Sequence, residues 1–416
     1  YSLLSVFTFV FLLSFNSLFA QSPTVQSVTS FTTEGTKAVG DQIEIKVIFS
    51  ESVTVTGTPT LKLETGTTDA VVNYSGGSPG SILNFNYTVS NGESSSDLDY
   101  FDTSSLSLNS GTIKATDDNT NATLTLSAPG QNGSLGDAKD YVIDGVPPTA
   151  AITYSPSGPY KNGETVIITA TFNEAILDSP FPTIAIVGSG IPNVSSINMT
   201  KTSTTVYTYS YAVPTADGTG TVTVGTGTDA ASNVVTSTPT SGATFTVDNT
   251  LPAFSSISPA TNSFVTSANV GYTLSEAIAS GIVKYTLTGG ASDVSSPHNV
   301  SLAGSELNTG TFSLGALTNA PTLVNGAVYS IAFNGTDAAG NAATAVTVTG
   351  ITYDITAPTI TSSVAGIDKA ENSGAGQTIY TITASDNVGA TSFAIGGDDA
   401  ALLSVNAGSG VVSLTA

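Results

Sequence analysis

The chain lacks cysteine and tryptophan, and its 416 residues include one methionine, one histidine and 9 lysine or arginine residues. Without cysteine there can be no disulfide framework, no thiolate metal site and no thiol nucleophile. A Ser-His-Asp triad would have to use His298, whose neighbours Ser-Ser-Pro-His-Asn-Val provide neither a nucleophile elbow nor a Gly-rich oxyanion turn. We therefore expect His298 to lie in a solvent-facing loop without a catalytic role.

Positive charge is also scarce, because 31 aspartate and glutamate residues give a formal net charge of −22. No cluster of lysine or arginine occurs, although nucleic acids and anionic lipid surfaces require one. The composition therefore argues against nucleic-acid binding and makes cations the natural small partners.

The first twenty residues contain an apolar run from Leu3 to Phe15, followed by Asn-Ser-Leu-Phe-Ala20 and then Gln-Ser-Pro. This pattern predicts a secretory signal peptide over residues 1–20, and an uncleaved anchor is the alternative, although the run is short for a bilayer span. No second segment is apolar enough to cross a membrane, so we expect no membrane insertion after cleavage. An exported chain without cysteine is typical of bacteria, and we expect secretion or display at the cell surface.

Short runs rich in β-branched and aromatic residues recur every 8 to 12 residues or so, without a helical period between them. Examples are Ile43–Phe49, Val166–Phe172 and Val270–Leu274. About seven such strands per hundred residues are typical of a two-sheet antiparallel sandwich. The expected fold class is all-β, with tandem Ig-like sandwiches in an extended array.

A nearly identical junction occurs three times, as Asp144-Gly-Val-Pro-Pro148, Asp248-Asn-Thr-Leu-Pro252 and Asp354-Ile-Thr-Ala-Pro358. A fixed period of about one small domain indicates a tandem array in which each unit has its own core. The predicted repeats are 22–147, 148–252 and 253–358, and a partial repeat occupies 359–416.

Two further elements recur once in each repeat. The sequences ending at Glu51, Glu174 and Glu276 read Phe-Ser-Glu, Phe-Asn-Glu and Leu-Ser-Glu, and Asp229-Ala-Ala-Ser-Asn233 is echoed by Asp337-Ala-Ala-Gly-Asn341. The first repeat has only a degenerate Asp117-Asp-Asn119. Residues 22–359 thus resemble the bacterial Ig-like repeats of large surface proteins and adhesins, and the first repeat resembles a longer variant of them.

After Pro358 the pattern changes and resembles the first half of a cadherin-like repeat. In that family a Glu near the domain start and an Asp after the second strand help to bind calcium. The resemblance implies Glu371 and Asp386 as the corresponding ligands. Since the 57 residues from 360 to 416 cannot complete such a sandwich, the chain is expected to be a fragment.

The repeated carboxylates and side-chain amides suit Ca²⁺, which takes about 6 to 8 oxygen ligands and binds extracellular modules with dissociation constants of roughly 10⁻⁴ to 10⁻³ M. The alternative is that Asp and Asn only form turns and that the Glu caps a loop. The candidate ligands for Ca²⁺ are Glu174, Asp229, Asn233, Asp248, Glu276, Asp337, Asn341, Asp354, Glu371 and Asp386.

Other chemistry has weaker support. A glycosidase needs one pair of facing acids in a cleft, whereas the repeated Glu recurs at a strand end in every repeat. Tyr207, Tyr209 and Tyr211 alternate along one strand and form either a sugar-stacking platform or one packed face of a sandwich.

We expect a non-catalytic stalk or adhesive region, a monomeric array whose partner is an unknown surface protein or glycan. The alternative is a set of accessory or carbohydrate-binding modules of a secreted hydrolase.

Overall fold

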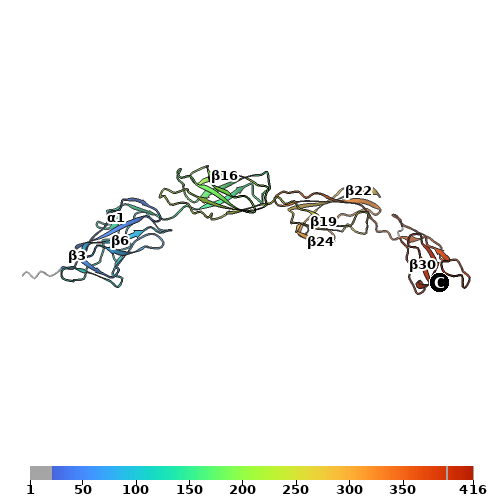
Figure 1. The fold of residues 1–416 in the computed structure, drawn as a ribbon, viewed down its shortest axis with the longest axis horizontal. Helices are drawn as coiled ribbons and strands as arrows, with labels where there is room; N and C mark the ends of the chain where they lie inside the picture. Colours follow the sequence, from blue (N-terminus) through green and yellow to red (C-terminus); the bar gives the residue numbers. More distant parts are fainter. Residues whose placement is uncertain (1–20, 390–391, 416) are drawn as a thin grey trace, which may run out of the picture.

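The computed structural model describes residues 21–389 and 392–415, so the predicted signal peptide lies outside the described residues. Three β-sandwiches and a smaller C-terminal unit follow one another in an extended array (Figure 1). The predicted fold class is confirmed. In the described part of the chain, the single α-helix is the one-turn α1 (Leu135–Ala138) of the first sandwich.

The first sandwich, which we call repeat 1, packs a seven-stranded sheet of order β1-β3-β6-β5-β4-β8, with β9 added to β3, against a small sheet of order β2-β10-β7. The long strand β3 pairs with β1, β6 and β9 and therefore organises the unit. The strands are β1 (Val25–Ser30), β2 (Gly35–Lys37), β3 (Gln42–Thr56), β4 (Thr60–Lys62), β5 (Val71–Gly76), β6 (Gly80–Thr88), β7 (Ser94–Ser95), β8 (Leu106–Ser107), β9 (Thr112–Ala115) and β10 (Tyr141–Asp144).

Repeat 2 consists of two four-stranded antiparallel sheets, with orders β11-β12-β16-β15 and β14-β13-β17-β18. Strict alternation along β12 buries Val166, Ile168, Ala170 and Phe172, as period-two patterning requires for a sheet with one face inward. The strands are β11 (Ala150–Ser155), β12 (Thr165–Phe172), β13 (Thr183–Ser189), β14 (Val194–Asn198), β15 (Thr200–Lys201), β16 (Val206–Ala212), β17 (Gly218–Gly225) and β18 (Thr244–Val247).

The alternating tyrosines of β16 belong to the core of repeat 2. Tyr207 and Tyr211 are buried, and the partly buried Tyr209 packs against the same cluster. The Tyr207 ring meets Phe172 edge to face at 5.8 Å, and the Tyr211 ring meets Phe245 at 5.2 Å. The three rings therefore stabilise the sandwich, and they do not form an exposed platform for sugars.

Repeat 3 packs a three-stranded sheet, β19-β21-β24, against a five-stranded sheet, β20-β26-β25-β22-β23. Its core contains an aromatic cluster in which Phe254, Tyr272 and Phe333 lie within 6.0 Å of one another, ring centre to ring centre. The elements are β19 (Phe254–Ser258), β20 (Phe264–Val265), β21 (Val270–Leu274), β22 (Ser280–Gly290), β23 (His298–Ser301), the 3₁₀ helix η1 (Gly304–Leu307), β24 (Gly310–Gly315), β25 (Ala327–Thr336) and β26 (Val346–Tyr353).

The C-terminal unit, residues 359–416, has a two-stranded sheet, β27-β29, and a three-stranded sheet, β28-β31-β30. In its described residues Val412 is the one buried hydrophobic side chain. Its elements are β27 (Thr359–Ile360), β28 (Thr378–Thr381), β29 (Ala384–Ser385), the 3₁₀ helix η2 (Ala400–Leu402), β30 (Leu403–Val405) and β31 (Val411–Leu414).

The buried hydrophobic residues form three separate clusters, drawn from residues 28–143, 150–247 and 254–351. The linkers with the Asp-x-x-x-Pro pattern lie at or just beyond the end of each cluster. The predicted boundaries at 147, 252 and 358 stay a prediction, which the folding of separated repeats would test.

Candidate cation sites at the repeat junctions

The linker aspartates form the same turn at all three junctions. Oδ1 of Asp144 accepts a hydrogen bond from Val146 N at 3.3 Å, Asp248 accepts from Thr250 N at 3.1 Å, and Asp354 accepts from Thr356 N at 3.0 Å. In such an Asx turn the Asp side chain accepts a hydrogen bond from the backbone N–H two residues further on, as is common in turns and loops that contain proline. The turn holds one carboxylate oxygen and leaves the second outside the turn.

The Asp-Ala-Ala-x-Asn loops of repeats 2 and 3 also share one geometry. Asp229 Oδ1 accepts from Asn233 N at 2.9 Å, and Asp337 Oδ1 accepts from Asn341 N at 2.8 Å. In each loop the Asn amide donates to the other Asp oxygen, at 2.8 and 2.9 Å. The loop aspartates are 1% and 4% exposed, so each loop presents a buried and well-supported carboxylate.

The third acid comes from the repeated Glu, which follows a central strand of the same repeat. Glu174 lies two residues beyond the end of β12, and Glu276 lies two residues beyond the end of β21. Both strands are anchored in the core, so the position of the Glu is set by its sheet. The strand end, the loop and the linker of the preceding repeat therefore meet at one place.

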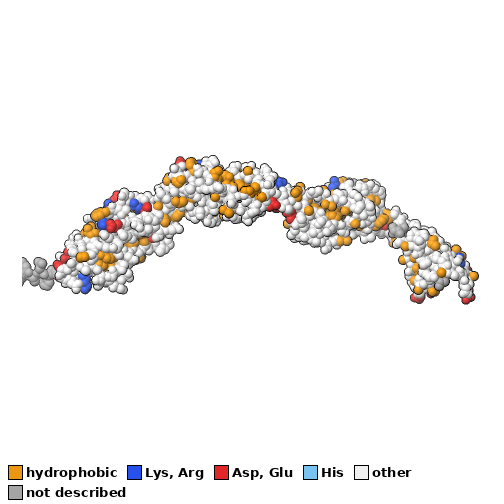
Figure 2. Space-filling view, viewed as in Figure 1, with side chains coloured by type: hydrophobic (Ala, Val, Ile, Leu, Met, Phe, Trp, Pro, Cys, Tyr) orange, Lys and Arg blue, Asp and Glu red, His pale blue; other side chains and the backbone are white. Residues whose placement is uncertain are grey.

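Two clusters of carboxylates result, each containing a linker Asp, a Glu and a loop Asp. In each cluster, one oxygen from every member lies within 4.8 Å of the others. Acidic side chains gather visibly where the second and third sandwiches meet (Figure 2). The clusters are Asp144, Glu174 and Asp229 at the junction of repeats 1 and 2, and Asp248, Glu276 and Asp337 at the junction of repeats 2 and 3.

In both clusters, negative charges lie close together without a salt bridge from the described residues to balance them. Burial raises the pKa of Glu174, and the nearby Asp229 and Asp144 raise it further. The pKa of Glu276 is raised by burial, then by Asp248 and Asp337. Within the described part of the chain, no salt bridge involves any of the six acids. A cation would offset this repulsion and satisfy the lone pairs.

The second cluster shows the larger deficit in hydrogen bonding. Glu276 Oε1 is buried and has no hydrogen-bond partner, whereas Glu174 Oε1 accepts a long bond of 3.4 Å from Asn173 Nδ2. Buried acceptors without partners are rare in folded proteins, and an ion is one of the standard explanations. The junction of repeats 2 and 3 is therefore the stronger candidate.

The third junction differs from the first two. Here Asn387 lies between Asp354 and Asp386. With the side-chain amide assigned so that its nitrogen faces these acids, the nitrogen is 3.1 Å from Asp354 Oδ1 and 3.0 Å from Asp386 Oδ1. Asp386 Oδ2 is buried without a partner. The structure thus brings the predicted Asp354 and Asp386 together through Asn387, a residue that the sequence reasoning missed.

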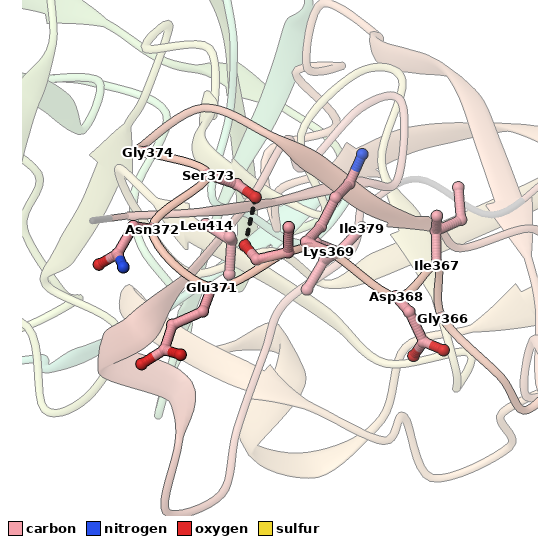
Figure 3. Close-up of a pocket in the computed structure, with 11 residues that line it drawn as sticks. Gly366, Ile367, Asp368, Lys369, Glu371, Asn372, Ser373, Gly374, Ile379 and Leu414 are labelled. Carbon is pink, nitrogen blue, oxygen red and sulfur yellow. Dashed lines mark hydrogen bonds between the residues drawn. The ribbon is translucent and has the colours of Figure 1, made fainter.

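Glu371 does not join this group. It is exposed in the loop of residues 366–374, which lines an open cavity of about 730 Å³ together with Ile379 and Leu414. The Glu371 and Asp368 carboxylates point away from each other (Figure 3). Among the described residues, Glu371 belongs to no trio of clustered acids. Its role as a ligand stays a prediction that the geometry does not strengthen.

The degenerate element of repeat 1 is a turn. Asn119 has a positive φ of 64°, and Asp118 Oδ1 accepts from Thr120 N at 2.8 Å. Both side chains are exposed. In repeat 1 the structure therefore favours these residues as turn formers over calcium ligands.

The expectation that His298 lies in a solvent-facing loop is wrong, because His298 begins strand β23 and its side chain is largely buried. Its Nε2 lies 2.7 Å from Asp293 Oδ2, and the hydroxyl of Tyr329 donates to the same oxygen at 2.7 Å. The His298 side chain is 15% exposed and Asp293 is buried. These hydrogen bonds, that of His298 first, lower the pKa of Asp293. The group ties the loop after β22 to β25. Asp293 and His298 are five residues apart, whereas Tyr329 is 36 residues from Asp293 and no local pattern reveals it.

Comparisons with known proteins give limited information. No family model matches the chain, and no curated protein matches it. Among solved structures, the FN1–FN3 domains of chicken CNTN1 are 10% identical, covering 80% of this chain and 99% of that one, with a TM-score of 0.26. A crystal structure of domains from titin is 11% identical over 80% of this chain and 100% of that one, with a TM-score of 0.27.

Extracellular cadherin domains of protocadherin gamma B2 cover 95% of this chain and 90% of their own, at 11% identity and a TM-score of 0.20. Scores this low carry no argument about role. In the part of the chain that the structure describes, no helix has the length and apolar character needed to span a bilayer.

Proposed function

We propose that the chain is a non-catalytic stalk from a secreted or surface-displayed bacterial protein, with calcium bound at its repeat junctions. The observation that carries the proposal is the recurrence of one carboxylate trio at two successive junctions. Each trio combines the end of one repeat with two loops of the next. A cation held there would oppose bending, because bending separates its ligands.

The ligands available at each site suit a hard cation. Every side-chain donor in a trio is a carboxylate oxygen, and neither cysteine nor a second histidine exists to form a site for a softer metal. Three carboxylates leave room for water and backbone carbonyls in a shell of about 6 to 8 oxygens. The incomplete protein shell fits an affinity in the weak extracellular range.

The direct test is thermal unfolding of the full chain in a chelator and then in about 5 mM Ca²⁺, which lies several-fold above that range. We expect Ca²⁺ to raise the unfolding temperature by several degrees and Asp337→Asn to abolish the part contributed by the second site. Asp118→Asn is the control, since it makes the same change to an exposed turn aspartate that lies in neither carboxylate trio. An equal calcium response in wild type and Asp337→Asn would contradict a site at this junction.

A further inference from the structure

Each Asp-Ala-Ala-x-Asn loop reaches across to the preceding repeat. Asn233 Nδ2 donates to the carbonyl of Asp144 at 2.8 Å, and Asn341 Nδ2 donates to the carbonyl of Asp248 at 2.8 Å. These contacts repeat to within the precision of the distances, although the linkers read Gly-Val-Pro in one case and Asn-Thr-Leu-Pro in the other. The Asn binds the linker backbone, so the linker side chains are free to differ.

The amide that makes this contact is held rigidly by its own loop. The second hydrogen of Nδ2 is bonded to the loop Asp, and the backbone N–H of the same Asn is bonded to the other oxygen of that Asp. Asn233 is 4% exposed and Asn341 is 9% exposed. Both donors of the amide nitrogen are thus used, and rotation of the amide would place its oxygen against acceptors.

A second contact at each junction comes from the turn that precedes a central strand of the earlier repeat. In repeat 1, Val39 N, in the turn before β3, donates to Asn233 Oδ1 at 2.9 Å. In repeat 2, Lys161 Nζ, in the turn before β12, donates to the carbonyl of Gly340. Each loop therefore holds its predecessor at two points, the linker and this turn, and two points restrict rotation about the linker.

We infer that Asn233 and Asn341 act as orientation locks, positioning each repeat on the one before it without a cation. The lock uses the N–H donors of the two amides, which cannot coordinate a metal, and the Asn233 oxygen accepts a hydrogen bond from Val39 N. Asn233 thus acts as a positioning residue beside the carboxylate trio, whereas the sequence suggested it as a ligand. The calcium proposal and the lock can fail separately, because the lock operates in a chelator.

The experiment measures distances between spin labels by electron paramagnetic resonance on the full chain in excess chelator. The absence of native cysteine allows labels at introduced cysteines alone. Val187→Cys and Val294→Cys, at positions 60% and 95% exposed, report on the junction of repeats 2 and 3. Phe31→Cys, at a position 73% exposed, paired with Val187→Cys reports on the junction of repeats 1 and 2.

We expect Asn341→Ala to broaden the 187–294 distribution and to leave the 31–187 distribution unchanged, and Asn233→Ala to do the reverse. The backbone N–H that closes the loop is retained in both variants. Asn308→Ala, which removes an exposed amide elsewhere in repeat 3, should change neither distribution. Unchanged widths in both Asn variants would overturn the inference.

If Asn341→Ala unfolds repeat 3, as circular dichroism would show, Lys161→Met gives an independent test from the opposite side of the junction. It leaves the loop intact and removes the second contact. A broadened 187–294 distribution would support the lock, and an unchanged distribution would overturn the two-point arrangement.

Discussion

Repeat 3 and the C-terminal unit both follow an Asp-x-Thr-x-Pro linker with the same Asx turn, but they differ in what they place against it. Repeat 3 supplies a Glu from a strand end and an Asp from a loop, both anchored on an aromatic core. The C-terminal unit supplies Asp386 and Asn387, and one buried hydrophobic residue lies among its described positions.

The comparison shows that the linker provides only half of a junction. The linker Asp is presented in the same way in both places, so the following unit decides whether three carboxylates converge. A rigid sheet behind the Glu and a closed loop behind the Asp are what convert the linker into a candidate site.

The largest expected difference between these regions concerns packing. Phe333→Ala removes a fully buried ring that contacts Phe254 and Tyr272, so we expect the free energy of opening of repeat 3 to fall by about 3–5 kcal/mol. Ile379→Ala, at a half-buried position in the C-terminal unit, should cost less than about 1 kcal/mol. Hydrogen exchange of amides in β25 and β28 measures both effects. Equal losses of protection would show that the C-terminal unit has a comparable core.

Next in size is the contribution of calcium. A site with a dissociation constant of about 10⁻⁴ to 10⁻³ M would stabilise its junction by about 1–2 kcal/mol in 5 mM Ca²⁺. Glu276→Gln should abolish this gain, since it removes a carboxylate of the trio, whereas Glu371→Gln should not. Calorimetric titration of the two variants checks the prediction. A larger loss in Glu371→Gln would move the site to the loop of residues 366–374.

The smallest effect is the pH dependence in a chelator. Because the pKa of Glu276 in the folded chain is raised above its unfolded value, the folded state binds the extra proton, and its stability should increase as pH falls through that raised pKa toward about 4.5. With calcium bound, the proton competes with the metal, so the calcium-dependent gain should shrink over the same interval. Unfolding temperatures of wild type and Glu276→Gln, measured across this pH interval with and without calcium, test both effects. A wild-type slope equal to that of the variant would show that Glu276 does not titrate in this range.

Much of this arrangement could be predicted from the sequence because repetition marks it. Glu276 and Asp337 are the counterparts of Glu174 and Asp229, and a residue that returns in successive repeats at a strand end or in a loop is recognisable without a structure. Asp144 was left out because its linker lacks the Thr of the others. The structure shows that Val146 N closes the same turn, so the side chain between Asp and Pro is not required.

What could not be predicted depends on contacts between distant segments. The Asp293 carboxylate that engages His298 is also bonded by Tyr329, 36 residues away, and no local pattern announces that partnership. Asn387 was missed because it occurs once, so it had no counterpart in the repeats to draw attention to it. The hydrogen bond from Asn341 Nδ2 to the Asp248 carbonyl could not be predicted either, since every residue has a backbone carbonyl and the sequence does not show which one accepts.

Repeat 2 has a different half of a junction at each of its ends, and this bears on how such a protein changes its length. At one end Asn233 donates a hydrogen bond to the preceding linker, and at the other end the Asp248 carbonyl accepts one from the following repeat. A duplicated copy of this stretch would carry both a matching head and a matching tail. Recombination between repeats could then lengthen or shorten the protein by one whole unit while every joint stays compatible, so its reach can change in discrete steps without a new interface.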